Sequence, residues 1–212
     1  MTLAQMLQQG LHVLDLDLPE AAHTKLLAYL ELLKKWNATY NLTAIREESA
    51  MLTQHLLDSL SILPHMEKSA LAERRWIDVG SGAGLPGIPL AIACPQLNIG
   101  LIDSVDKKTA FQRQVKIELG LSNITVIGGR VEDYPASTCD AVISRAFAEL
   151  ADFVSLAGHL IVDGGYLYAM KGQLPEDEIA RMPANWRVKA CKKLVVPGLM
   201  AERHLIVLQK AN

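Results

Sequence analysis

A glycine-rich stretch with an acidic residue before it is the part of this sequence best suited to hold a ligand. It reads IDVGSGAGLPGIPLA and spans residues 77–91. Glycine adopts backbone conformations that are strained in other residues and lets a ligand approach the main chain closely. Asp78 ends a short apolar run, and Gly80, Gly82 and Gly84 follow it. These residues predict a loop that binds a small molecule against its backbone.

Two classes of cofactor fit such a loop. Residues 82–87 match the G-x-G-x-x-G fingerprint of dinucleotide-binding proteins, but the fingerprint alone is weak. A carboxylate at Asp78 repels a pyrophosphate and attracts the ammonium group of S-adenosylmethionine. Asp103, at the end of the next apolar run, is placed to accept hydrogen bonds from ribose hydroxyls, which both classes carry. We therefore expect S-adenosylmethionine as the cofactor, with a nicotinamide-dependent oxidoreductase as the rival interpretation.

Each of these residues also has an interpretation without a ligand. Asp78 would then cap a helix or anchor the loop, and the glycines would form a tight turn for structural reasons alone. Asp103 would simply end its strand in solvent. The residue pattern leaves these alternatives open.

The elements that must position this loop change character near residue 72. Before it, apolar residues recur with helical spacing, so we expect an N-terminal helical segment over residues 1–72. Over residues 73–212, short β-rich runs alternate with helical stretches, which predicts an α/β domain with a mostly parallel sheet. The expected strands are 76–79, 99–103, 124–127, 141–144 and 166–170, closed by an antiparallel hairpin of 188–196 and 203–209. One helix should start at Asp106 as its N-cap and end before Gly120.

Composition limits the class of protein. The chain has 212 residues, of which 50% are hydrophobic, and a formal net charge of -2. No stretch approaches the roughly 18 apolar residues of a membrane span, and the first residues do not resemble a secretory signal. The three cysteines lie far apart without metal-ligand spacing, so we expect free thiols and no bound metal. These features predict a cytoplasmic protein, with a monomer as the default state.

Seven segments, in order along the chain, resemble a known family. They are KWNATYNLTAIRE (35–47), HLLDSL (55–60), the glycine-rich stretch, LIDSVDKKTAFQ (101–112), VISRAF (142–147), MKGQLPEDEI (170–179) and ERHLIVL (202–208). On these motifs the chain is identified as a member of the glucose-inhibited division protein B family, the bacterial guanine-N7 methyltransferases of small-subunit ribosomal RNA. The resemblance runs from about residue 20 to the last expected strand.

The resemblance implies a Rossmann-like class I methyltransferase. Such an enzyme transfers a methyl group from S-adenosylmethionine to N7 of one guanine, guanine 527, near the decoding region of 16S ribosomal RNA. Its partner is then 16S ribosomal RNA or the small ribosomal subunit. Matched by position, the family pattern assigns cofactor contacts to Gly80, Leu85, Val131, Glu132 and Arg145.

This chemistry asks for positioning rather than for a general base. Guanine N7 carries an exposed lone pair, so nothing has to be deprotonated before it attacks. The sequence offers no obvious Ser/His/Asp, Cys/His or paired-carboxylate constellation. Arg145 is the charged residue expected beside the reacting centre, where it would bind the cofactor carboxylate, an RNA phosphate or guanine O6. A structural ion pair with Glu149 or another acid is the alternative.

Basic and aromatic residues are the candidates for contact with RNA. Phosphate contacts are open to Lys107, Lys108, Arg113, Arg130 and the basic residues of the C-terminal end. Base stacking is open to Trp36, Tyr40 and Phe147. Solvated charge and core packing are the competing interpretations, and His55 with Asp58 is expected to brace the N-terminal helices. A methyltransferase for small molecules or proteins and a noncatalytic RNA-binding module remain as rival functions.

Overall fold

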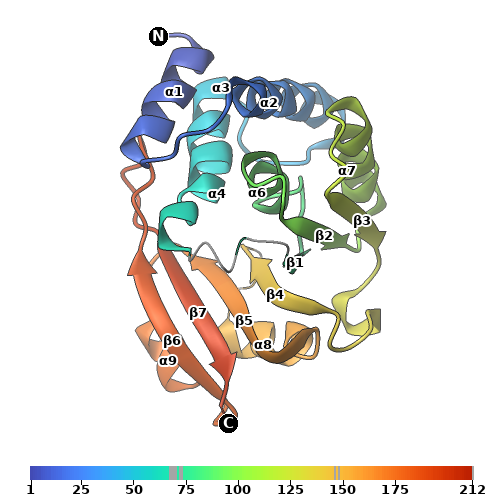
Figure 1. Cartoon of the computed structure of the whole chain (residues 1–212), viewed down its shortest axis with the longest axis vertical. Helices are drawn as coiled ribbons and strands as arrows, with labels where there is room; N and C mark the ends of the chain where they lie inside the picture. Colours follow the sequence, from blue (N-terminus) through green and yellow to red (C-terminus); the bar gives the residue numbers. More distant parts are fainter. Residues whose placement is uncertain (67–70, 72–73, 146, 148, 212) are drawn as a thin grey trace.

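A seven-stranded mixed sheet forms the centre of the protein (Figure 1). The computed structural model describes residues 1–66, 71, 74–145, 147 and 149–211. Within them the strands lie in the order β3-β2-β1-β4-β5-β7-β6. They are β1 Arg75–Val79, β2 Asn98–Asp103, β3 Ile124–Gly128, β4 Cys139–Ser144, β5 Ile161–Lys171, β6 Trp186–Lys193 and β7 His204–Lys210. The expected boundary between residues 72 and 73 lies outside the described residues.

The strand directions agree with the predicted α/β fold, in which most strands are parallel. The strands from β3 to β5 pair in parallel, whereas β7 pairs antiparallel with both β5 and β6. The predicted parallel sheet that ends in an antiparallel hairpin is therefore confirmed. The two hairpin strands begin and end within a few residues of the expected positions. The first strand ends at Lys193 rather than at residue 196, and Leu194 already belongs to the connection, where its N–H donates to the Arg203 carbonyl.

The order of the strands reverses at β1. The chain moves outward from β1 to β2 and β3 and then returns to place β4 on the other side of β1. Asp78 is accordingly in register with Leu101 of β2 and with Ile143 of β4. In open α/β sheets, the crevice outside the carboxyl ends of the strands at such a reversal is the usual ligand site. The glycine-rich stretch leaves β1 at this point.

Helices cover both faces of the sheet. In chain order they are α1 Leu3–Val13, α2 Glu20–Tyr40, α3 Glu48–Met51, the π-helix Leu52–Leu57, α4 Asp58–Leu60, the 3-10 helix Leu63–His65, α6 Gly87–Ala93, α7 Asp106–Glu118, the 3-10 helix Val131–Asp133, α8 Leu150–Ala157 and α9 Glu176–Ala180. Figure 1 shows α1 to α4, α6 and α7 on one side and α8 with α9 on the other.

Two hydrophobic clusters fill the space between the helices and the sheet. One joins the N-terminal helices, α6 and α7 to one face, and includes Leu26, Trp76 and Leu101. The other packs α8 against the opposite face, around Ile77 and Phe153. Trp76 and Ile77 are neighbours in β1, so successive side chains enter different clusters, as the pleat of a strand requires. The N-terminal helices thus share one continuous core with the sheet.

One predicted helix cap is wrong. Val105, not Asp106, is the N-cap of α7, and Asp106 is the first helical residue. The Asp103 carboxylate accepts a hydrogen bond from the Val105 N–H at 2.9 Å, which draws the chain into the helix one residue earlier. At the other end the prediction is confirmed, because Gly120 follows the helix with a φ of 59°.

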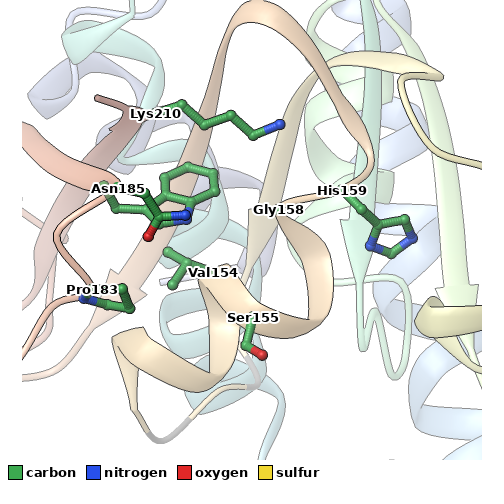
Figure 2. Close-up of a pocket in the computed structure, with 8 residues that line it drawn as sticks. Val154, Ser155, Gly158, His159, Pro183, Asn185 and Lys210 are labelled. Carbon is green, nitrogen blue, oxygen red and sulfur yellow. The ribbon is translucent and has the colours of Figure 1, made fainter. Parts of the chain in front are cut away.

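A pocket of about 360 Å³ lies where α8 ends (Figure 2). Val154, Ser155 and His159 line it from α8 and the turn behind it, and Lys210 lies across from them. Because β5 begins directly after this turn, the pocket lies toward the amino ends of the parallel strands, away from the glycine-rich stretch. Trp186, a buried residue at the start of β6, also lines the pocket.

Replacing Gly158 by alanine should destabilise the fold without affecting ligand binding at the carboxyl ends of the strands. A Cβ atom there would lie 2.4 Å from the Val154 carbonyl oxygen and 2.5 Å from the Trp186 ring. We expect a loss of about 1–3 kcal/mol in the free energy of unfolding, because overpacking forces the ring to move. Urea unfolding measures it, with Ser155→Ala on the exposed side of the same helix as the control. Equal stability of the two variants would contradict this account of the packing.

Candidate active site

Two carboxylates at the ends of neighbouring strands hold the glycine loop, residues 80–86. The Asp78 side chain at the end of β1 accepts a hydrogen bond from the Gly87 N–H at 2.8 Å. The Asp103 side chain at the end of β2 accepts one from the Gly82 N–H at 2.8 Å. A buried backbone N–H needs such a partner, and a carboxylate is a strong acceptor for it. The path of the loop is therefore fixed by charges beneath it.

Asp78 is the more deeply placed of the two acids. Its side chain is fully buried, and one of its oxygens, Oδ1, has no hydrogen-bond partner in the part of the chain that the structure describes. Burial raises the pKa of Asp78 to about 7, while the Gly87 N–H and the charge of Arg145 pull it down. The structure thus shows the loop anchor that the sequence left open. An electrostatic role toward a cofactor remains a prediction.

Other side chains complete the support of the loop. Gln112 of α7 donates from Nε2 to the Ser81 hydroxyl and to the Gly82 carbonyl, both at 2.8 Å. Tyr29 of α2 donates its hydroxyl to the Ala83 carbonyl at 2.9 Å, and burial raises the pKa of this phenol. Sequence reasoning missed Gln112 and Tyr29. Gln112 closes one of the family-like segments, but Tyr29 carries no local signal because its partner lies 54 residues away.

The three glycines of the loop have positive φ angles but different surroundings. The angles are 66° at Gly80, 59° at Gly82 and 83° at Gly84. Gly84 is buried, and a Cβ there would lie 2.2 Å from Ile88 Cδ1, so this glycine allows α6 to pack against the loop. Leu85 is buried beside it. Gly80 is exposed and therefore leaves its backbone open to a ligand.

The end of β3 lies next to the loop. Asp103 is in register with Gly128, and the Gly129 N–H donates to the Asp103 carbonyl at 3.1 Å. The 3-10 helix that follows carries the next two predicted cofactor residues. Val131 is buried against the cluster beneath α8, and Glu132 is exposed, 3.5 Å from the Arg130 guanidinium. The structure thus brings the predicted residues of β1, β2 and β3 to one edge of the sheet.

Arg145, which follows β4, forms an ion pair with Asp58 from the N-terminal segment. Its Nη1 lies 3.1 Å from Asp58 Oδ2, and Arg203 Nε lies 3.1 Å from the other oxygen, Oδ1. Asp58 is nearly inaccessible, while both arginine side chains are about one quarter exposed. The expected alternative of an acid partner is therefore confirmed, but the acid is Asp58. Glu149 pairs with Arg181 instead.

The π-helix contributes a second contact to Arg145. The Gln54 carbonyl accepts from Arg145 Nη1 at 3.3 Å, and His55, next in the chain, is buried beside it. Burial, aided by the Arg145 charge, lowers the pKa of His55 to about 4, so the ring is neutral at pH 7. Its Nε2 is 2.9 Å from the Thr43 hydroxyl. π-Helical turns are frequent at functional sites. His55 braces the N-terminal segment through Thr43, as expected, whereas Asp58 pairs with two arginines outside that segment.

A cavity of about 620 Å³ opens beyond the carboxyl ends of β4 and β5. Arg145, Phe147, Lys171 and Glu178 are among the residues that line it, and we call it the acceptor cavity. The Arg145 charge partly offsets the rise that burial causes in the pKa values of Asp78 and Tyr29, both of which support the glycine loop. Arg145 therefore lines the cavity, and its charge also acts on two groups that support the loop.

Several residues expected to contact RNA have partners within the protein. Lys107 donates to the Tyr40 carbonyl at 2.8 Å, and Lys108 lies 3.6 Å from Asp103. Trp36 packs between Tyr40 and Phe111, and Arg113 donates to the Thr109 hydroxyl. Phe147 packs against Phe153 but also lines the acceptor cavity. Core packing thus accounts for Trp36, whereas stacking on a base remains open to Phe147.

Within the described ranges, no three His, Cys, Asp or Glu side chains are grouped so that they could hold a metal ion. The cysteines at positions 94, 139 and 191 are free thiols. None of the helices that the structure describes is both long and apolar enough to cross a membrane.

Comparison with known proteins places the chain among ribosomal RNA methyltransferases. A profile of the family described as rRNA small subunit methyltransferase G matches residues 22–206. A ribosomal RNA small subunit methyltransferase G of Azoarcus sp. is 53% identical over 98% of this chain and 96% of its own. One from Neisseria meningitidis serogroup C is 53% identical over 97% and 98%. A SAM-dependent methyltransferase of Aquifex aeolicus has the same fold, with a TM-score of 0.56, 18% identity, and 75% and 92% coverage.

Replacing Asp58 by alanine should strongly destabilise the protein. The change leaves two partly buried guanidinium groups without their shared carboxylate, which typically costs about 3 kcal/mol or more. Urea unfolding followed by circular dichroism measures the loss. The control is Glu149→Ala, which removes an exposed ion pair and should cost less than about 1 kcal/mol. Similar losses in the two variants would show that Asp58 does not hold Arg145 and Arg203 together.

Proposed function

Because the chain belongs to the rRNA small subunit methyltransferase G family, we propose that it transfers a methyl group from S-adenosylmethionine to N7 of guanine 527 in 16S ribosomal RNA. Family membership confirms the resemblance read from the motifs, and with it the activity of a small-subunit ribosomal RNA methyltransferase. The nucleotide and the position N7 are the further part of the proposal. They rest on the order and identity of the seven segments.

The observation that carries the choice of cofactor is the buried Asp78 carboxylate beneath an exposed Gly80. Asp103 adds a second carboxylate under the same loop. Two negative charges at this position oppose a pyrophosphate, so they disfavour the dinucleotide alternative in spite of the fingerprint. They favour a ligand that carries an ammonium and a sulfonium. When bound, S-adenosylmethionine supplies an electrophilic methyl group.

The residues of the chain then have distinct roles. Gly80 is proposed to present open backbone to the cofactor, Asp78 to favour its ammonium group, and Asp103 to accept hydrogen bonds from its ribose hydroxyls. Val131 and Glu132 are proposed to bound the adenine, and Arg145 to fix the reacting centre by binding a carboxylate or guanine O6. A bidentate grip on both O6 and N7 is excluded, since it would cover the nucleophile. A base is not needed, so the site works by placing charge and by orienting its two substrates.

We propose that the protein acts in the cytoplasm as a monomer on 16S ribosomal RNA or on the small subunit. The basic residues of the C-terminal hairpin support contact with RNA phosphates. Lys189, Lys192 and Lys193 lie on β6, at the edge of the sheet. Phosphate contacts orient a protein on RNA without specifying the sequence.

Mapping of 7-methylguanosine in 16S ribosomal RNA tests the proposed function. Cells that lack the gene should lose one modified guanine, and the wild-type gene should restore it. Gly80→Asp should fail to restore it, since it adds bulk and negative charge where the cofactor meets the backbone. Gly164→Asp is a matched control, because Gly164 is also exposed and has a φ of 80° but lies near the start of β5. An unchanged modification map in the deletion strain would refute the acceptor.

The affinity for S-adenosylmethionine should rise with pH through the pKa of Asp78. A cationic ligand favours the ionised carboxylate, so binding releases a proton from Asp78 when its pKa is about 7 in the free protein. Calorimetry should show affinity rising by up to about eight-fold between pH 5.5 and pH 6.5, more than one unit below the pKa of about 7.7–8.0 at which a free α-amino group loses its charge. Asp78→Asn keeps an acceptor for the Gly87 N–H but removes the charge, so its affinity should be flat. Equal pH dependence in both proteins would exclude Asp78 as the source.

A further inference from the structure

The acceptor cavity lies one strand away from the glycine loop. The loop follows β1, Arg145 follows β4, and Lys171 ends β5, which are successive neighbours in the sheet. Arg145 lines the cavity and its charge reaches Asp78 beneath the loop. The loop, Arg145 and Lys171 thus stand at the carboxyl ends of three successive strands, with Arg145 after the middle one.

The charges around the cavity are unsuited to a phosphate. Four carboxylates line it, from Glu149, Glu176, Asp177 and Glu178. The cations that line it, Arg145, Lys171 and Arg181, each form an ion pair with a carboxylate. Glu176 and Asp177 form no ion pair with any described residue. This excess of negative charge favours a group rich in hydrogen-bond donors or one that becomes positive during the reaction.

Glu178 has a fixed carboxylate with one oxygen available. Its Oε2 accepts from the Leu150 N–H at 2.8 Å and from Lys171 Nζ at 2.7 Å. No described residue donates to the other oxygen, Oε1. The side chain is 18% exposed, so it is partly open to the cavity that it lines. Two bonds to Oε2 orient the group in advance, which is what a recognition site requires.

We propose that the acceptor cavity holds the guanine and that Glu178 Oε1 accepts hydrogen bonds from its N1–H and 2-amino groups, an inference that rests on the proposed function. Guanine carries these donors on one edge and N7 on the opposite edge, with O6 between them. Contact at the donor edge therefore leaves N7 uncovered. Arg145 is placed to donate to O6, and Phe147 to stack on the ring.

The same arrangement suits the course of the reaction. Guanine N7 gives its lone pair to the methyl carbon, and the bond from that carbon to sulfur breaks with its electron pair left on sulfur. No proton moves, and the positive charge passes from the sulfonium to the base. The carboxylates of the cavity then stabilise the charge that develops on the guanine. Adenine, whose edge carries no N1–H or 2-amino group, lacks the contact to Oε1.

Replacing the target guanosine by inosine in the RNA or subunit that the enzyme methylates tests this reading. Inosine keeps N7, O6 and N1–H but lacks the 2-amino group. We expect kcat/KM of the wild type to fall by about ten-fold or more on inosine, the usual effect of one lost base contact. Glu178→Gln should lower kcat/KM on both nucleosides, because both carry N1–H, but by a larger factor on guanosine, which also loses the contact to its 2-amino group. The ratio of kcat/KM on guanosine to kcat/KM on inosine would then approach one.

The substitution has a defined geometric effect. Leu150 and Lys171 both donate to the position of Oε2, so the amide oxygen takes that place and the amide nitrogen faces the cavity. The hydrogen-bond acceptor Oε1 is thus replaced by an N–H donor, which faces the N1–H and 2-amino donors of guanine. Glu176→Gln, on the same helix and lining the same cavity, is the matched control and should keep the full preference. A partly unfolded variant lowers both rates together and leaves their ratio intact.

The outcomes separate the two proposals. A wild-type enzyme that methylates guanosine and inosine equally well overturns the assignment of Glu178 and leaves the proposed function standing. Equal losses on both nucleosides in Glu178→Gln also overturn it and assign Glu178 a structural role through Lys171. A wild-type enzyme that methylates neither nucleoside overturns both proposals.

Discussion

The backbone of the glycine loop rests on two carboxylates, and the remainder of the site is arranged around this constraint. Asp78 and Asp103 receive N–H groups from Gly87 and Gly82, so the loop has its shape before any ligand arrives. A fully buried carboxylate is costly, as the raised pKa of Asp78 shows. The cost is tolerable because the parallel pairing of β1 and β2 brings both acids to one edge, where loop N–H groups can reach them.

The N-terminal helices belong to the site rather than to an appendage. Tyr29 supports the loop from α2, and Asp58, at the start of α4, forms ion pairs with both Arg145 and Arg203. These contacts join segments up to 145 residues apart in sequence. Removing the helices would therefore expose one face of the sheet and also leave Arg145 without its partner. The site and the core are stabilised by the same packing.

The sequence predicted what depends on local pattern. Alternating strands and helices, the antiparallel hairpin and the turn at Gly120 each follow from residues close together in the chain. The N-cap of α7 was predicted wrongly because the Val105 carbonyl already accepts from the N–H groups of Lys108 and Thr109, while Asp103 holds Val105 through its N–H. The partner of Arg145 could not be predicted, because Glu149, which is near in sequence, pairs with Arg181, whereas Asp58 reaches Arg145 only through the tertiary fold.

The acidic side chains are distributed in a way that fits a reaction in which a positive charge moves from one group to another. The reaction that we propose begins with a positive sulfonium and ends with a positive base, so the total charge stays constant while its position changes. An acid beneath the loop favours the starting location, and acids along the acceptor cavity favour the final one. Arg145 follows β4, the strand between β1 and β5, and its ion pair with Asp58 reduces its repulsion of a positive charge at either place. If Arg145 were unpaired, it would oppose the movement of positive charge past it. If Arg145 orients the substrates as we propose, Asp58 would matter to the chemistry as well as to the fold, because it fixes the guanidinium and reduces the positive charge that it presents.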